Sequence, residues 1–165
     1  MSVMVRPMRD GEARSFLEIQ RAAVRGLAAK DYSASVIDAW APLPITDTAI
    51  AFFRVNHDNE IRIVAELDGA VVGIGALVVA DSELRACYVA PSAARNGVGS
   101  ALVAEIERMA RHHGLTHLEL LSSLTAEPFY RALGYEVEDR VEHVLGSGDR
   151  MAAVKMRKGL PLSRL

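Results

Sequence analysis

Two glycines open what reads as a long amphipathic helix, in the stretch SAARNGVGSAL from Ser92 to Leu102. Glycine in a helix interior costs roughly 0.5 to 1 kcal/mol relative to alanine, so a pair on the first turn needs a compensating role. The unpaired backbone N–H groups of a helix's first turn, together with the positive end of its dipole, bind phosphate. Gly97 and Gly99 therefore indicate a place where an anion comes close to the main chain.

Two common phosphate-binding motifs do not fit this stretch. A Rossmann domain carries G-x-G-x-x-G in the turn after its first strand, whereas here Leu102 holds the third glycine position and the motif follows the fourth predicted strand. A P-loop requires Gly-Lys-Ser/Thr, and GVGSAL has no lysine. Both interpretations are therefore excluded.

Other reactive side chains have simpler interpretations. Cys87 has no evident histidine partner near it in the sequence, so we expect a packed thiol rather than a nucleophile. His112 and His113 suit the C-terminus of a helix, and adjacent helical residues point about 100° apart, so neither is expected to bind a metal. Glu107 and Arg111 have the spacing of a solvated i,i+4 pair. No metal site is predicted.

The composition bounds the class of protein. The 165 residues suit one domain, 1–165, with a substantial core. A net charge of −2 without a dense Lys/Arg run argues against nucleic acid as a partner. A single cysteine fits a reducing compartment, and the sequence has no apolar stretch long enough to cross a membrane. We therefore expect a soluble cytoplasmic protein without a membrane partner.

The segments that position the glycine motif alternate between the two hydrophobic periods. Helices are predicted after Asp10 as its cap, from Ser33 to before Pro42, from Gly97 to Gly114, and over 125–133. Strands are predicted over 3–8, 61–67, 70–80, 84–90, 116–121, 135–145 and 150–158, with Asp68-Gly69 as a hairpin turn. The order is strand, two helices, three strands, helix, strand, helix, two strands. It indicates an α/β (α+β) fold with one mixed sheet.

One stretch of the sequence carries four features of a known family. Four features occur in order between Leu84 and Glu138: Tyr88-Val89 with a proline two residues on, G-x-G opening a helix, a following strand, and PFYRALGY. Together they resemble the acetyl-CoA-binding half of the GNAT superfamily of N-acetyltransferases. The resemblance implies a single, mostly antiparallel central sheet of about seven strands with helices on both faces. It also implies that the fourth strand bulges and splays away from the fifth.

The resemblance implies a site for acetyl-CoA as co-substrate. The amides of residues 95–100 would bind the pyrophosphate, and the main chain of the fourth strand would hold the thioester and stabilise the oxyanion. The residues expected to contact coenzyme A are Cys87, Tyr88, Val89, Arg95, Asn96, Gly97, Val98, Gly99, Ser100, Ser123 and Phe129.

Two catalytic residues also follow from the resemblance. The tyrosine of the F-Y pair, Tyr130, would donate a proton to the departing thiolate, and helical spacing turns it toward the sheet. A core tyrosine with a satisfied hydroxyl is the alternative. Glu83, just before the fourth strand, would take the proton of the amine directly or through water; an exposed carboxylate at the start of a strand is the alternative.

The sequence departs from the family pattern at two positions. Ala94 stands where Gln or Arg is usual, with Arg95 one place later, and Ser123 stands where many members have Asn. A serine can still donate to a pantetheine carbonyl.

The acceptor is predicted only as a primary amine, of a small molecule or a peptide. Tyr32 and Trp40, with the carboxylates of Glu18, Asp31 and Asp38, could line a pocket for a cationic amine, or Trp40 could simply pack an amphipathic helix. A non-catalytic acyl-CoA-binding or sensing domain stays the alternative function, and an unrelated nucleotide-binding protein is a third. The closing strands could pair between two chains, so a homodimer is possible.

Overall fold

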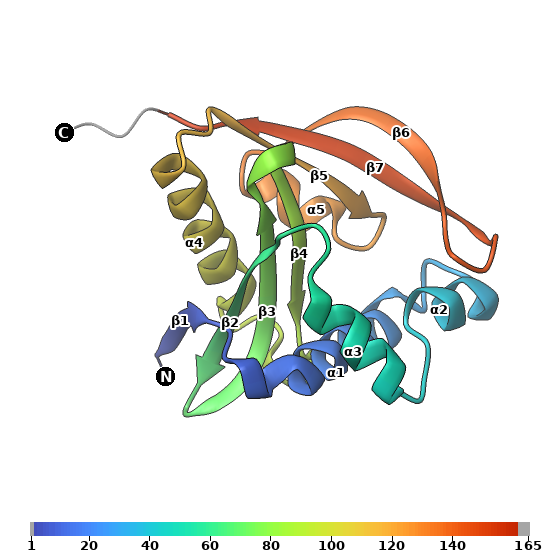
Figure 1. Ribbon diagram of the computed structural model, residues 1–165. Helices are drawn as coiled ribbons and strands as arrows, with labels where there is room; N and C mark the ends of the chain where they lie inside the picture. The colour runs from blue at the N-terminus through green and yellow to red at the C-terminus, as the bar shows by residue number, and fades with distance from the viewer. Residues whose placement is uncertain (1, 162–165) are drawn as a thin grey trace.

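The computed structural model describes residues 2–161 as one seven-stranded mixed sheet with helices on both faces, as expected (Figure 1). The strands are β1 (Val3–Pro7), β2 (Ile61–Leu67), β3 (Ala70–Val78), β4 (Glu83–Val89), β5 (His117–Ser123), β6 (Glu136–Val144) and β7 (Arg150–Gly159). Their order in the sheet is β1-β2-β3-β4-β5-β7-β6, and only β4 and β5 run parallel. The last strand of the chain is therefore inserted between β5 and β6.

Three helices, rather than the two expected, precede β2. They are α1 (Ala13–Ala23), α2 (Ala34–Trp40) and α3 (Asp47–Val55). The periodicity did not reveal α3, because it buries none of its residues fully and therefore lacks a clear apolar stripe. Asp10 was wrongly predicted as the cap of the first helix: it begins a 3-10 turn over Asp10–Glu12, and the carboxylate of Glu12 accepts from the backbone N–H of Arg9 at 2.7 Å.

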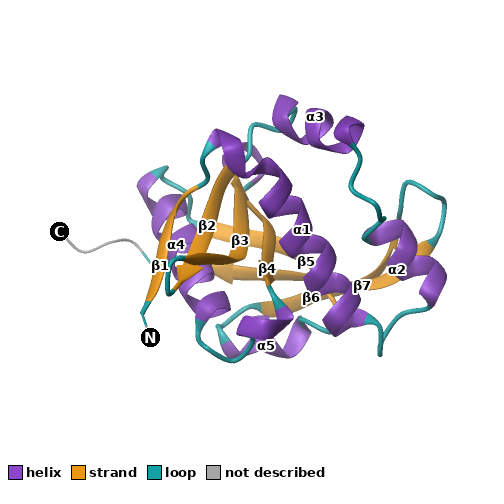
Figure 2. Cartoon of the chain, turned by 90° about the horizontal axis from the view of Figure 1, so that it is seen from below, coloured by secondary structure: helices purple, strands orange, loops and turns teal. Residues whose placement is uncertain are grey.

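The two faces of the sheet are covered by different helices (Figure 2). Helix α1 packs on β3 and β4, while α4 (Val98–His112) crosses the opposite face beneath β1 to β5. The buried stripe of α4 consists of Val98, Leu102, Val103, Ile106 and Ala110. Helix α5 (Glu127–Ala132) packs beside β5. The fourth strand is thus enclosed between the N-terminal helices and α4.

The chain leaves β2 for β3 at Asp68 and Gly69, both with positive φ, as the predicted two-residue turn requires. Gly114 and Gly134 also have positive φ and follow α4 and α5, which confirms them as stop signals.

The feature that matters most for function is the separation of β4 from β5. Their pairing is limited to Glu83 with Glu119, next to a bond of 2.8 Å from the Glu119 N–H to the Ser82 carbonyl. A β-bulge at Arg85 interrupts the pairing of β4 with β3. Beyond this point β5 turns away from β4, as Figure 1 shows, and the expected splay is confirmed.

Candidate active site

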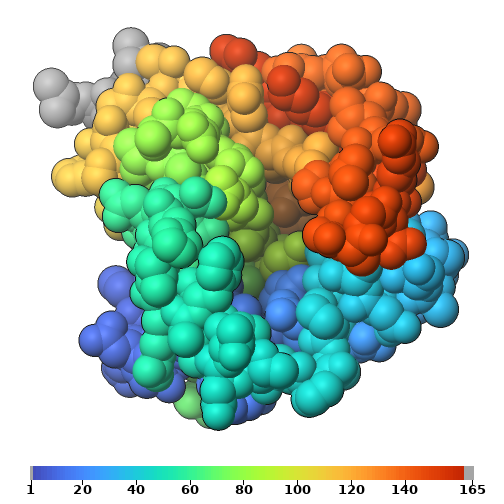
Figure 3. Space-filling model, turned by 45° about the vertical axis from the view of Figure 1, so that its right-hand side comes forward, coloured from blue at the N-terminus to red at the C-terminus, as the bar shows by residue number. Residues whose placement is uncertain are grey.

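Two adjoining cavities occupy the splay between β4 and β5. The first, of about 400 Å³, lies against the start of α4 and is called the donor cavity here. The second, of about 380 Å³, lies beside α5 and the β6–β7 hairpin and is called the acceptor cavity. Both are lined by Trp40, Cys87, Tyr88, Ser123 and Ala126, so they meet at the middle of β4. The molecule is visibly hollowed between α3, the β6–β7 hairpin and the N-terminal helices (Figure 3).

The backbone before α4 forms a cradle of N–H groups. Arg95 and Gly97 have φ of 67° and 77°, so two left-handed residues stand at alternate positions. Such an arrangement turns successive N–H groups to one side. The first amide of this stretch with a backbone acceptor is that of Ala101, which donates to Gly97 O at 3.1 Å. No described residue accepts from the amides of residues 95–100. Such a nest suits a diphosphate.

The two glycines of the motif have different physical roles. A Cβ on Gly97 would meet nothing within 4 Å, so this glycine is needed for its positive φ and leaves open space beyond it. A Cβ on Gly99 would lie 3.0 Å from the ring of Phe129. Gly99 therefore permits the close approach of α4 to α5, a role that the sequence pattern did not indicate.

Not every residue expected to contact coenzyme A in this segment lines the donor cavity. Arg95, Gly97, Val98, Gly99, Ser100 and Phe129 line the donor cavity. The Val98 side chain is buried under the sheet, so its main chain is the part available to a ligand. Asn96 does not line the cavity, because its amide donates to Ala93 O at 3.3 Å.

Of the β4 residues expected to hold the thioester, Cys87 and Tyr88 line both cavities at their junction, and Val89 lines only the donor cavity. Because β4 makes no backbone pairing with β5 beyond Glu83, its main-chain groups that face β5 are open to the cavities. The thiol of Cys87 donates to Gly99 O at 3.8 Å, and burial raises its pKa to about 12. A thiol that stays protonated is a poor nucleophile.

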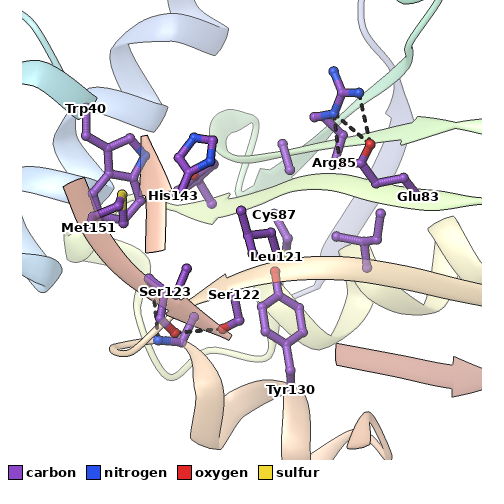
Figure 4. Close-up of a pocket in the computed structure, with 15 residues that line it drawn as sticks. Trp40, Glu83, Arg85, Cys87, Leu121, Ser122, Ser123, Tyr130, His143 and Met151 are labelled. Carbon is purple, nitrogen blue, oxygen red and sulfur yellow. Dashed lines mark hydrogen bonds and ion pairs between the residues drawn. The ribbon is translucent and has the colours of Figure 1, made fainter. Parts of the chain in front are cut away.

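Tyr130 lies under this junction. Its ring is 6% exposed and packs edge-on against Phe129 and Tyr135, with centroids 5.1 and 5.8 Å apart. The hydroxyl points into the acceptor cavity toward Cys87 and Leu121 (Figure 4). None of residues 2–161 forms a hydrogen bond with that hydroxyl. Burial is the main cause that raises its pKa well above the usual value, so the phenol stays protonated.

Glu83 lies at the other end of the acceptor cavity, where its carboxylate is held by Arg85 (Figure 4). The guanidinium donates through Nε to both carboxylate oxygens at 3.0 Å and through Nη2 to Oε1 at 2.9 Å. A carboxylate has about four lone-pair sites, so Oε2 keeps one for a further donor. Glu83 as base stays a prediction.

Ser123 has a local structural role. Its Oγ accepts from the Ala126 N–H at 3.1 Å, at the turn into α5, and the hydroxyl proton remains available to a ligand in either cavity. The neighbouring Ser122 is buried and donates to the Ser123 carbonyl at 2.7 Å.

Tyr32 and Trp40 close the site from the N-terminal side. The rings meet edge-on at 5.7 Å, and Trp40 lines both cavities. The Tyr32 hydroxyl donates to Ala152 O at 2.6 Å and accepts from the Leu124 N–H at 2.8 Å. Tyr32 therefore ties the segment before α2 to both β7 and the loop before α5, across the open side of the splay.

The carboxylates predicted beside these aromatic residues do not line the cavities. Asp31 accepts from the Thr125 hydroxyl at 2.6 Å, and Asp38 pairs with Arg25 at 2.8 Å. Glu18 is exposed on α1. The structure does not assemble them into a pocket for a cationic amine.

Residues of the closing hairpin were missed. His143 and Met151 occupy paired positions on β6 and β7 and line the acceptor cavity next to Trp40 (Figure 4). The sequence around His143 has the pattern of a solvent-facing strand residue, so no local signal pointed to it.

The predicted pairing of Glu107 with Arg111 is wrong. Glu107 accepts from Lys158 Nζ at 3.0 Å and from the Tyr135 hydroxyl at 3.0 Å, because α4 packs against the sheet beside β7.

Among residues 2–161, no group of three His, Cys, Asp or Glu side chains is arranged to hold a metal ion.

Comparison with known proteins identifies the family of this chain. The family model described as "Acetyltransferase (GNAT) family" matches residues 21–135. The chain belongs to the GNAT acetyltransferase family. Curated protein sequences include no match to this GNAT chain.

Solved structures share the whole fold. A GCN5-related N-acetyltransferase from Rhodopseudomonas palustris, also described as a class-II aminotransferase, is 27% identical, with a TM-score of 0.88 and coverage of 97% of both chains. The PaiA N-acetyltransferase from Thermoplasma acidophilum, solved with coenzyme A, is 22% identical, with a TM-score of 0.75 and coverage of 96% of this chain and 99% of its own. YncA from Salmonella typhimurium, a putative acetyltransferase solved with acetyl-CoA, is 18% identical, with a TM-score of 0.71 and coverage of 100% and 98%.

Membership of this GNAT family indicates acyltransferase activity. None of the helices formed by the described residues is long and apolar enough to cross a membrane.

Proposed function

We propose that the protein transfers the acetyl group of acetyl-CoA to a primary amine by direct attack within a ternary complex. The observation that carries this proposal is the junction of the two cavities at Cys87 and Tyr88, which gives a donor and an acceptor a common point of contact on β4. Both substrates can then be bound at once, with no acyl-enzyme between them.

The donor cavity suits coenzyme A. The unpaired amides of residues 95–100 would bind its pyrophosphate, and the open space beyond Gly97 leaves the main chain accessible. The acetyl-CoA thioester supplies the activated acetyl group. The β4 main-chain groups that do not pair with β5 would form hydrogen bonds with the pantetheine arm. The arm would then lie along β4 in the way that an extended peptide adds to the edge of a sheet.

The same stretch of β4 can stabilise developing negative charge. A main-chain N–H of residues 87–89 would donate to the thioester oxygen as charge builds up there. Such a donor is typically worth about 3 to 4 kcal/mol of transition-state stabilisation.

Tyr130 is the proposed general acid. Its protonated hydroxyl lacks a partner in the described part of the chain and points to the junction, so it can donate a proton to the leaving sulfur. The ring is buried, but the hydroxyl opens into the acceptor cavity without a partner among the described residues, which argues against a purely structural tyrosine, whose hydroxyl would be satisfied.

Two groups in the acceptor cavity can receive the proton of the amine. Glu83 is the base that we propose, acting through a water molecule on the remaining lone pair of Oε2. His143, on the opposite side of the cavity, is the second candidate, because it lines the cavity and its imidazole forms no ion pair among the described residues.

Thiol release from acetyl-CoA, measured with a broad panel of amines, tests the activity. Amine-dependent release that follows sequential kinetics is expected. Tight binding of acetyl-CoA without release for any amine would instead support the acyl-CoA-binding domain. A thermal-shift comparison of coenzyme A with ATP and NAD serves as a control, since only coenzyme A is expected to stabilise the protein.

A further inference from the structure

A third hollow continues the acceptor cavity outward. This groove, of about 370 Å³, lies between α1 and α3, and it shares Arg85 and Ala86 with the acceptor cavity. Its apolar walls come from Phe16 and Leu17 on one helix and Phe53 on the other. The groove and the acceptor cavity thus form one path along β4 from the surface to the junction.

The charges along this path are balanced in number. Apart from two histidines, the charged residues that line it are three arginines and three carboxylates, Arg21, Arg62, Arg85, Asp58, Glu60 and Glu83.

Five of these six form one connected network. Arg85 pairs with Glu83 at 2.9 Å, with Asp58 at 2.8 Å and with Glu60 at 3.4 Å. Arg62 in turn pairs with Glu60 at 2.8 Å. Every carboxylate on the path therefore already has an arginine, so none is left to recognise a cationic substrate.

Arg21 stands outside the network. Its Nε donates to Pro42 O at 3.1 Å and its Nη1 donates to the side-chain oxygen of Gln20, and both acceptors are neutral. Within residues 2–161, no carboxylate comes within ion-pair distance of it. Its side chain is half-buried, and burial is the main cause that lowers its pKa, with the nearby Arg25 cation adding to the effect. An anion beside this guanidinium would replace the counter-ion that the fold does not supply.

The position of Arg21 relates this charge to the reaction. Arg21 lines the groove, which shares Arg85 and Ala86 with the acceptor cavity. It therefore lies on the outer part of the path that leads to Tyr88, a residue that lines both the donor and the acceptor cavity.

We propose that the acceptor is a small primary amine that also carries a carboxylate, and that Arg21 binds this carboxylate while the amine reaches the junction. The inference rests on the proposed acetyltransferase function and narrows its substrate class. A guanidinium suits this role because its planar N–H groups match the geometry of a carboxylate, and Nη2 makes no bond to the described residues.

The test compares matched acceptors. Common L-amino acids are assayed for thiol release from acetyl-CoA, each beside its amide and its decarboxylated amine. Binding of the same compounds to the full-length protein saturated with coenzyme A is measured by calorimetry. The wild-type protein is expected to favour at least one amino acid over both neutral counterparts by about ten- to hundredfold in kcat/KM or in Kd.

Variants show whether Arg21 is responsible. Arg21→Met is expected to abolish the preference, whereas Arg21→Lys, which keeps the charge, retains part of it. Arg14→Met is the matched control, because Arg14 lies on the same helix, is 53% exposed and pairs at 3.6 Å with Asp47. Thermal unfolding of each variant confirms folding.

The outcomes separate the two proposals. If neutral amines are acetylated and bound as well as amino acids, or if Arg21→Met keeps the preference, the carboxylate site is refuted and the acetyltransferase function stands. If no compound in the panel shows a carboxylate preference by either readout, the inference is likewise overturned. Failure to bind acetyl-CoA at all would remove the proposed function itself.

Discussion

The hydroxyl of Tyr32 donates a hydrogen bond of 2.6 Å to the carbonyl of Ala152, and these two residues are 120 positions apart in the chain. The same hydroxyl accepts from the Leu124 N–H, so one phenol holds the N-terminal helices against both the β7 strand and the loop that leads into α5. This contact spans the open side of the splay, and the Tyr32 ring packs against Trp40, which lines both cavities.

Tyr32→Phe should loosen this closure without emptying the space that the ring fills. Two hydrogen bonds are lost, so we expect a decrease of roughly 1 to 2 kcal/mol in the free energy of unfolding and a severalfold higher KM for acetyl-CoA. Chemical denaturation and steady-state kinetics measure the two effects. Ser35→Ala is the control, since Ser35 bonds Asp149 at 2.7 Å on the surface of the same region. Equal effects of the two substitutions would mean that Tyr32 has no special role.

Tyr130→Phe should lower kcat by about 100-fold or more and leave the KM for acetyl-CoA nearly unchanged, because only the proton donor is removed. Single-turnover and steady-state assays measure the change. Tyr135→Phe is the matched control, because it removes a tyrosine hydroxyl that donates to Glu107 and does not line the acceptor cavity. It should reduce stability and spare kcat. A Tyr130→Phe enzyme with normal turnover would remove this residue from the mechanism.

Gly99→Ala should destabilise the protein, because the added Cβ would lie 3.0 Å from the ring of Phe129. We expect a cost of about 1 to 3 kcal/mol, as for other overpacked sites. In a Phe129→Leu background the same change should cost clearly less, and urea unfolding of the four proteins measures the coupling. An additive cycle combined with weakened coenzyme A binding would show that Gly99 serves the ligand instead.

Cys87→Ala should retain most of the acetyltransferase activity. Burial holds the pKa of the Cys87 thiol at about 12, above its usual range, so the thiolate is nearly absent below pH 10. We therefore expect slow alkylation by iodoacetamide at pH 8 that becomes fast in denaturant. Because the folded pKa exceeds the unfolded one, this residue's contribution to stability is present below about pH 9 and decreases as the pH rises toward 12. Ping-pong kinetics, or an acetylated thiol, would contradict this assignment.

The two candidate bases can be separated by substituting each in turn and measuring steady-state kinetics. Glu83→Gln should lower kcat about tenfold or more if this carboxylate receives the proton. His143→Asn should then leave kcat nearly unchanged. The reverse result would assign the role to His143 and leave Glu83 as a partner that orients Arg85.

The sheet, the glycine-led helix and the buried tyrosine were accessible from the sequence because each depends on local pattern. Alternation predicts strands, and positive φ at Asp68, Gly69 and Gly114 follows from turn chemistry. The motif around Gly97 and the F-Y pair carry the family resemblance within a single stretch of the chain. Helix α3 was not predicted from the sequence, because it buries none of its residues fully.

Contacts between distant segments were decided only by the tertiary structure. Tyr32 meets Ala152, Glu107 meets Lys158, and His143 faces the acceptor cavity, because β7 enters the sheet between β5 and β6 and carries the closing hairpin over the site. A local sequence pattern does not indicate which distant residues will come into contact. The same holds for charge: the sequence shows many arginines, and only packing reveals which carboxylates they use and that Arg21 is left without one among the described residues.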